Sequence, residues 1–139
     1  MIFFLDTNVL VDLVQKREPH FAIVSQIFNV STKDDVELCA SSHSIATLHY
    51  LCKKNMQESS LRELIDEILN FITIIPVDED ILRKSLRSQH KDFEDAIQIF
   101  CAHQVKNVTG IVTRNIKDFS TSEIPVFAPD EALDYVRNN

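Results

Sequence analysis

The chain has 139 residues, of which 45% are hydrophobic and 25% charged, so it is long enough for one domain with a buried core and too short for two ordinary ones. Its longest apolar run, residues 71–77, is interrupted by Thr73 and Pro76 and is far shorter than the roughly 20 residues that a membrane-spanning helix needs. The net charge of −7 excludes nucleic-acid binding by bulk electrostatic attraction, so any such role must depend on local patches or bound cations.

The termini and the cysteines favour a protein that stays in the reducing compartment where it is made. The apolar run at the start, residues 1–5, is too short for the core of a signal peptide. Three cysteines, an odd number without a ligand spacing, lie in apolar segments at Cys39, Cys52 and Cys101. We therefore expect reduced core cysteines in a cytoplasmic protein.

Short apolar runs alternate with segments of helical periodicity along the chain. The expected strands are residues 2–5, 36–40, 71–77, 109–113 and 125–127. The expected helices are one that follows the first strand, one from Pro19 that ends in 31–35, one over 43–54, one opened by a Ser60 and Glu63 capping box, one capped by Asp78 or Asp80, one from Asp92, and one from Pro129.

Strands that are separated by helices pair in parallel, because each crossover returns the chain to the same end of the sheet. The sequence therefore predicts an α/β fold, a three-layer sandwich with a central, mainly parallel β-sheet. We expect residues 1–139 to form a single domain, because no linker or repeat interrupts them.

Polar side chains follow the strands of the predicted sheet at the point where functional groups gather in such folds. Asp6 ends the first strand, and Thr113 and Asn115 end the fourth. Asp92 and Asp95 stand at i and i+3 at the start of their helix. Clustered oxygen ligands suit Mg²⁺ or Mn²⁺. The alternative is structural, because Asp6 and Asp92 are also good helix caps, and two carboxylates in a first turn interact favourably with the helix dipole without a metal.

Three segments taken together resemble the PIN-domain family, and within it the compact VapC-like toxins. They are the first strand with Asp6-Thr7-Asn8, the helix start Asp92-Phe93-Glu94-Asp95-Ala96, and Thr113-Arg114-Asn115 with Lys117-Asp118-Phe119 after it. The resemblance extends from residue 2 to about residue 136. Each segment is weakly specific alone, and their order and spacing carry the resemblance.

The resemblance implies a site for Mg²⁺ or Mn²⁺ in which Asp6 and Asp95 hold the ion and Asp92 orients or shares it. Thr113 and Asn115 would contact the water or the phosphate. Two positions depart from the family pattern: Thr47 stands where members usually carry a Glu, and Asn115 where many carry a fourth Asp. Because each missing charge weakens cation binding, a one-metal or weak two-metal site is expected, with Asp118 as a nearby source of charge.

Other features of the sequence support or exclude further readings. Arg83, Arg87, His90 and Lys91 are expected on one helix face, either as a phosphate-tracking rim or as a solvated surface. His43 and His49 are six residues apart and cannot share zinc from one helix face. Asn8 and the apolar residues before Asp6 argue against haloacid-dehalogenase-type phosphatases and receiver domains, and the single Gly110 excludes glycine-rich nucleotide loops.

The function that the resemblance implies is a metal-dependent endoribonuclease that cleaves RNA phosphodiester bonds, as the toxin of a toxin–antitoxin pair. Its partners would be RNA, an antitoxin protein and a second copy of the chain in a homodimer, with no membrane. The alternative, motivated by Thr47 and Asn115, is a catalytically weakened PIN fold that binds RNA or a protein.

Overall fold

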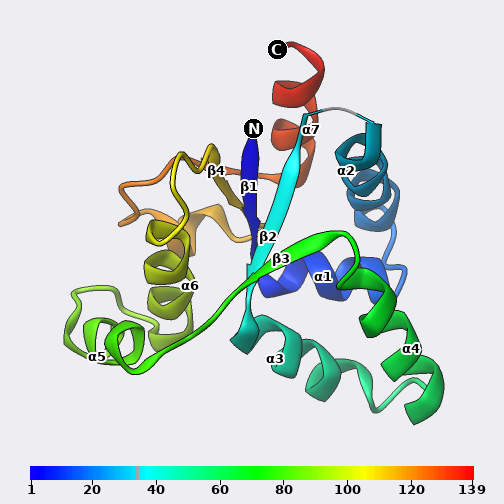
Figure 1. Ribbon diagram of the computed structural model, residues 1–139, viewed down its shortest axis with the longest axis horizontal. Helices are drawn as coiled ribbons and strands as arrows, with labels where there is room; N and C mark the ends of the chain where they lie inside the picture. Colours follow the sequence, from blue (N-terminus) through cyan, green and yellow to red (C-terminus); the bar gives the residue numbers. More distant parts are fainter. Residues whose placement is uncertain (34) are drawn as a thin grey trace.

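The computed structural model describes residues 1–33 and 35–139, and its centre is one five-stranded parallel sheet (Figure 1). The strand order is β3-β2-β1-β4-β5, and all four neighbouring pairs are parallel. The strands are β1 (Ile2–Leu5), β2 (Glu37–Ser41), β3 (Ile72–Ile75), β4 (Gly110–Val112) and β5 (Val126–Phe127).

Helices cover both faces of the sheet and so produce three layers (Figure 1). They are α1 (Thr7–Val14), α2 (His20–Lys33), α3 (Ser42–Cys52), α4 (Glu58–Ile68), α5 (Glu79–Arg87), α6 (Phe93–His103), the 3₁₀ helix η1 (Ile116–Phe119) and α7 (Pro129–Arg137). The predicted three-layer, parallel α/β sandwich is therefore confirmed.

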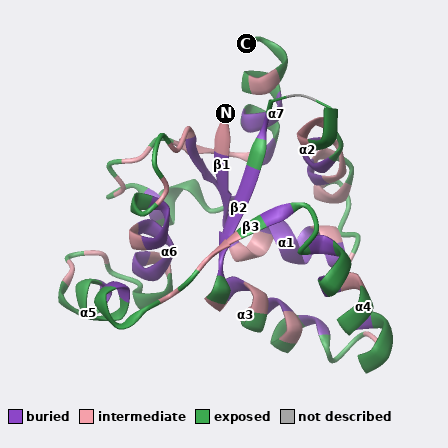
Figure 2. Ribbon diagram, viewed as in Figure 1, coloured by how far each residue is buried: buried purple, intermediate pink, exposed green. Residues whose placement is uncertain are grey.

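Alternation along the strands produces two separate cores, one on each face of the sheet. Phe3 and Leu5 pack with side chains of α1 to α4 and α7, whereas Phe4 packs with α5, α6 and Phe119. Both cores are continuous with the central strands, which are buried almost throughout (Figure 2). Because successive side chains of a strand point to opposite faces, the uninterrupted apolar β1 can serve both.

The parallel arrangement puts the carboxyl ends of all strands at one edge of the sheet. At this edge Asp6 and Ser41 are the N-cap residues of the helices that follow β1 and β2 directly. The only glycine, Gly110, lies at the opposite end of β4, where an added Cβ would stand 2.4 Å from a ring carbon of Phe127. That contact explains a residue without a side chain in a buried strand.

Several local predictions were wrong. Ser60 lies inside α4, whose N-cap is Gln57 without a side-chain hydrogen bond, so the predicted capping box does not form. Phe93, whose spacing from Ile97 and Phe100 predicts a place on the apolar face of α6, is 44% exposed. The helix α5 ends at Arg87, so His90 and Lys91 lie in the following loop and share no helix face with Arg83. The predicted end of the second helix includes residue 34, which lies outside the described residues.

Two basic side chains of α5 are also less available for binding phosphate than the sequence indicated. Arg83 is paired with Glu79 and Lys84 with Asp80, each one turn apart on the exposed face of α5. The cysteine prediction is confirmed, since all three cysteines are buried and free. None of the helices in the described residues combines the length and the apolar character that a bilayer crossing needs.

Candidate metal and phosphodiester site

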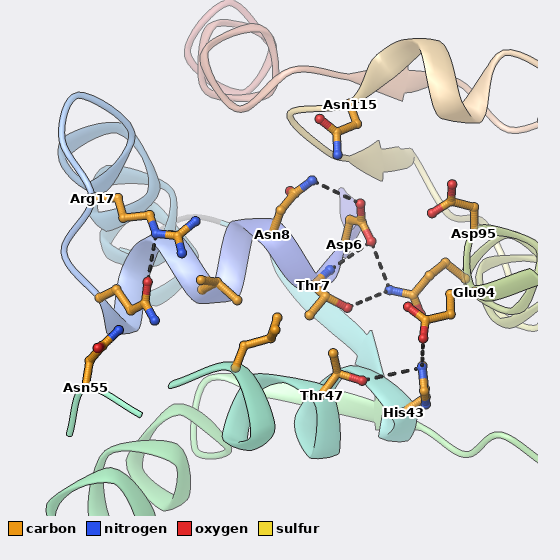
Figure 3. A pocket seen from close by; sticks show the side chains of 14 residues that line it. Asp6, Thr7, Asn8, Arg17, His43, Thr47, Asn55, Glu94, Asp95 and Asn115 are labelled. Carbon is orange, nitrogen blue, oxygen red and sulfur yellow. Dashed lines mark hydrogen bonds and ion pairs between the residues drawn. The ribbon is translucent and has the colours of Figure 1, made fainter. Parts of the chain in front are cut away.

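A cavity of about 460 Å³ opens at the carboxyl edge of the sheet, between α1, α3 and the start of α6 (Figure 3). Four of the residues singled out from the sequence line it, namely Asp6, Thr47, Asp95 and Asn115. Thr113 lies beneath the cavity lining, in contact with Asp6. Asp92 does not line the cavity and caps α6 instead.

Asp6 is a buried carboxylate whose two oxygens are each held by two donors. The backbone N–H of Thr7 (2.8 Å) and the side-chain amide of Gln98 (3.1 Å) donate to Oδ1, while the Thr113 hydroxyl (2.8 Å) and the Asn8 amide (3.3 Å) donate to Oδ2. Burial raises the pKa of Asp6, and the bonds from Gln98, Thr113 and Thr7 oppose that rise. The orientation of the Asp6 carboxylate is therefore fixed by four hydrogen-bond donors.

Gln98 joins Asp6 to the start of α3 and was not expected from the sequence. Its amide nitrogen also donates to the Ser44 hydroxyl (2.7 Å), and its carbonyl oxygen accepts from Ser41 (2.6 Å). Gln98, Ser41 and Ser44 are all buried. The sequence did contain a clue to this role. Gln98 stands one turn after Asp95 among apolar residues of a helix, and an amide buried at such a position needs hydrogen-bond partners.

Asp95 lines the cavity with its carboxylate free of hydrogen bonds and ion pairs within residues 1–33 and 35–139. Desolvation raises its pKa to about 7, and the negative charges of Asp92, Asp6, Asp118 and Glu94 add to the rise. Several carboxylates thus act on one group, and no cation among the described residues compensates its charge. This arrangement favours a proton or a bound cation at Asp95.

Asp92 has the structural role that the sequence left open. Its Oδ1 accepts from the backbone N–H of Asp95 (2.9 Å), and it is exposed. Its charge still raises the pKa of Asp95, so it lies close enough to act electrostatically. Its assignment as a shared metal ligand stays a prediction.

The wall of the cavity on α3 carries Thr47 and His43 rather than a carboxylate. His43 Nε2 lies 3.4 Å from the Thr47 hydroxyl and 3.7 Å from Glu94 Oε1 (Figure 3). The sequence argued only against a zinc site at His43 and did not predict that this side chain lines the cavity. Thr47 also lines the cavity, and its correspondence to the acidic position of the family stays a prediction.

The fourth side of the cavity is built by the chain after β4. Thr113 Oγ1 accepts from the backbone N–H of Asn115 (3.0 Å), which fixes the turn that brings Asn115 to the cavity. Arg114 forms two bonds with the fully buried Asp12 of α1, the shorter of 2.5 Å. This pair anchors the loop to α1, and neither partner was singled out from the sequence.

Within the described part of the chain, no three His, Cys, Asp or Glu side chains form a group that could hold a metal ion. Three carboxylates line the cavity, namely Asp6, Glu94 and Asp95, together with the amide of Asn115. Glu94 lies 3.7 Å from His43 Nε2, which leaves Asp6, Asp95 and Asn115 as the candidate donors. A hydrated Mg²⁺ or Mn²⁺ needs no more, since Mg²⁺ is commonly bound through one or two carboxylates and keeps several waters. The residues thus fit a one-metal, water-rich site.

The sequence of the chain was compared with protein-family models and with characterised proteins. The model of the PIN domain matches residues 3–117. A sequence relative, Ribonuclease VapC1 of Aquifex aeolicus (strain VF5), is 27% identical over 133 residues, which cover 92% of this chain and 90% of that protein.

Solved structures show the same fold. A toxin–antitoxin complex from Klebsiella pneumoniae contains a chain that is 28% identical, with a TM-score of 0.64 over 91% of this chain and 96% of that one. VapBC2 from Rickettsia felis, bound to a DNA fragment from its promoter, has a TM-score of 0.68 at 21% identity, over 92% and 98% of the two chains.

Proposed function

We propose that this chain, which belongs to the PIN-domain family, is a metal-dependent endoribonuclease and the toxin of a toxin–antitoxin pair. The observation that carries the proposal is that Asp6 and Asp95, from different elements, line one cavity together with Asn115. Similarity to a protein named as a ribonuclease supports RNA as the substrate. We take residues 1–139 as one domain and the cytoplasm as its location.

Asp6 and Asp95 would hold the ion, and divalent-metal dependence is general for PIN-domain ribonucleases of the VapC type. A bound Mg²⁺ or Mn²⁺ makes water a better nucleophile and offsets the negative charge that develops on the phosphate. Gln98 and Thr113 aim the carboxylate of Asp6. Asn115 lines the cavity where it can bond a water or a phosphate oxygen.

An antitoxin is the partner that this proposal requires, and toxin–antitoxin complexes among the similar structures support it. We propose that the antitoxin places a basic or amphipathic segment over the carboxylates, because the uncompensated charge at Asp95 attracts a Lys or Arg side chain. Binding should then weaken when Asp6, Asp92 and Asp95 are replaced by Asn. A homodimer is proposed from the family resemblance alone.

The alternative function is a PIN fold that binds RNA or protein without turnover. The observation that favours it is the absence, within the described residues, of three metal-ligating side chains in one group. Thr47 in the cavity wall and Asn115 explain that absence, because each stands where many family members carry an acid.

Cleavage of a single-stranded RNA with Mg²⁺, Mn²⁺ or EDTA tests the proposal. Asp6→Asn and Asp95→Asn should abolish cleavage while the protein stays folded. Asn can replace Asp6 as the N-cap of α1, and the Asp95 carboxylate has no hydrogen bond to lose among the described residues. Asp130→Asn, which removes an exposed carboxylate from the first turn of α7, is the matched control. Activity that persists in EDTA or in both variants would refute the metal mechanism, and a folded wild type that binds RNA without cleaving it would favour the alternative.

A further inference from the structure

The cavity continues away from the carboxylates as a groove between α1 and α3. Among the lining residues, Thr7 and Val11 of α1 are followed at the same spacing by its C-cap residue Gln15, and α3 contributes His43, Thr47 and Leu51, so each set advances in steps of four residues. Residues four apart lie on one face of a helix. Two helix faces therefore line the groove, and the eight residue steps from Thr7 to Gln15 correspond to about 12 Å of helix rise.

The two ends of the groove differ in charge. Asp6, Glu94 and Asp95 stand at one end, whereas Arg17 and Asn55 stand at the other (Figure 3). Arg17 is exposed, and its Nε donates to the side-chain oxygen of Gln15 (2.8 Å). No carboxylate among the described residues pairs with it.

Further cations flank Arg17. Lys16 precedes it in the turn after α1, and Lys53 and Lys54 lie in the turn after α3. All three are exposed and none takes part in an ion pair in the described structure. The two turns lie at the same end of the cavity, since Arg17 of the first turn and Asn55, next to Lys54, both line it (Figure 3). In contrast, Arg62, Arg83, Lys84 and Arg114 each pair with an acidic side chain.

We infer that the Arg17 end of the groove is a phosphate subsite, which binds the backbone of a single-stranded RNA a few nucleotides from the bond at the carboxylates. A groove of about 12 Å spans roughly three nucleotides at the 3.4 Å rise of a stacked strand. Val11 and Leu51 give the middle of the groove an apolar lining, on which bases can pack. This inference rests on the proposed function and adds the path of the RNA strand, which would extend along the groove from the carboxylates to Arg17.

The physical need for such a subsite comes from the charge of the protein. With a net charge of −7 and several carboxylates at the reacting end, an RNA strand is repelled unless local cations attract it. Arg17 offers a guanidinium fork that matches phosphate geometry. Lys53 and Lys54 add positive charge nearby, and the Lys53 ammonium lies 5.0 Å from the centroid of the Tyr50 ring.

Binding of a fluorescently labelled 12-nucleotide single-stranded RNA, measured by anisotropy in EDTA, tests the subsite. Arg17→Gln should weaken binding about three- to tenfold and reduce the slope of log affinity against log salt by about 0.7, the value for one phosphate contact of a single strand. Arg17→Lys should retain most of the affinity. Lys106→Gln, which removes an exposed cation between α6 and β4, is the matched control and should bind as the wild type does.

Two further measurements separate the subsite from the metal site. Mn²⁺ binding by calorimetry should be the same for the wild type and Arg17→Gln. Cleavage of a dinucleotide, which is too short to reach Arg17 from the carboxylates, should be unaffected by Arg17→Gln, whereas kcat/KM for the 12-nucleotide RNA should fall.

Equal affinities and equal salt slopes for the wild type, Arg17→Gln and Lys106→Gln would overturn the subsite. Binding of an acidic protein segment would then be the role left for the cations around Arg17. An equal loss on the dinucleotide and on the longer RNA would also overturn it, because Arg17 would then act at the reacting end. RNA binding that depends on Arg17 without any cleavage would refute the nuclease and retain the subsite. A wild type that neither binds nor cleaves RNA would refute both.

Discussion

Replacing Asp95 with Asn should stabilise the metal-free protein at neutral and alkaline pH. The carboxylate of Asp95 is surrounded by the charges of Asp92, Asp6, Asp118 and Glu94, and its pKa is raised from 3.8 to about 7. An Asn side chain has the same shape and no charge. The variant therefore removes the repulsion and the desolvation cost of the ion.

The size of the effect follows from the shift in the pKa. Three pKa units correspond to about 4 kcal/mol as an upper limit, and because Asp95 is only half-buried, screening by solvent reduces this to about 1–2 kcal/mol. For 139 residues, an unfolding entropy of about 2 cal/mol/K per residue converts that gain into a rise in Tm of roughly 3–6 °C.

The sign of the pH dependence is fixed by the direction of the shift. Between pH 4 and pH 7 the unfolded chain has lost the Asp95 proton while the folded chain retains it, so the stability of the wild type falls as the pH rises through this window. Below pH 4 both states are protonated. The gap in Tm between Asp95→Asn and the wild type should thus be small at pH 4, widen up to pH 7 and then stay constant.

Thermal unfolding in EDTA at several pH values measures this gap, with Asp130→Asn as a control that lacks the crowded charges. Saturating Mn²⁺ should reverse the order at pH 7.5, because the wild type alone retains both proposed ligands. A gap that is equal at pH 4 and pH 8 would refute the argument. A variant less stable than the wild type at pH 8 would show that Asp95 acts mainly on the helix dipole.

The remaining predictions concern residues around the crevice. Gln98→Leu should lower the free energy of unfolding by about 1–3 kcal/mol, because Ser41 and Ser44 lose their buried partner, and calorimetry should record weaker Mn²⁺ binding. Arg114→Ala should cost about 3 kcal/mol or more in denaturant unfolding, since it leaves Asp12 buried and unpaired; a loss below 1 kcal/mol would contradict this. Thr47→Glu should tighten Mn²⁺ binding about tenfold, which is the effect of about 1.4 kcal/mol, whereas unchanged affinity would mean that the side chain cannot reach the ion.

The order of the elements could be predicted because the apolar periodicity of this chain is strong. The run 2–5 reads as a buried strand, and Asp78 and Pro129 mark helix starts correctly. The failures have local causes. The pair Ser60 and Glu63 satisfies a capping pattern, yet α4 begins two residues earlier at Glu58, because contacts of Leu61 and Ile65 with the core decide where that helix lies.

The site could be predicted only as far as strand ends and helix starts determine it. Asp6, Asp95 and Asn115 were predicted to lie together because each follows or begins an element at the carboxyl edge of the sheet, and they line one cavity. Gln98 and His43 were missed because their roles depend on which face of a helix meets the crevice. That information comes from packing between helices and not from spacing along one of them.

The pairing of charges separates the crevice from the rest of the molecule. On α5 and at Asp12, opposite charges are paired with one another, whereas Asp95 faces other carboxylates and has no cation near it in the described structure. Stability of the fold alone does not favour a carboxylate at position 95, since we expect the metal-free protein to be more stable with an uncharged residue there. The crowding therefore supports the proposed function, in which a cation from outside the chain would complete the site, either a metal ion or a basic side chain of a partner.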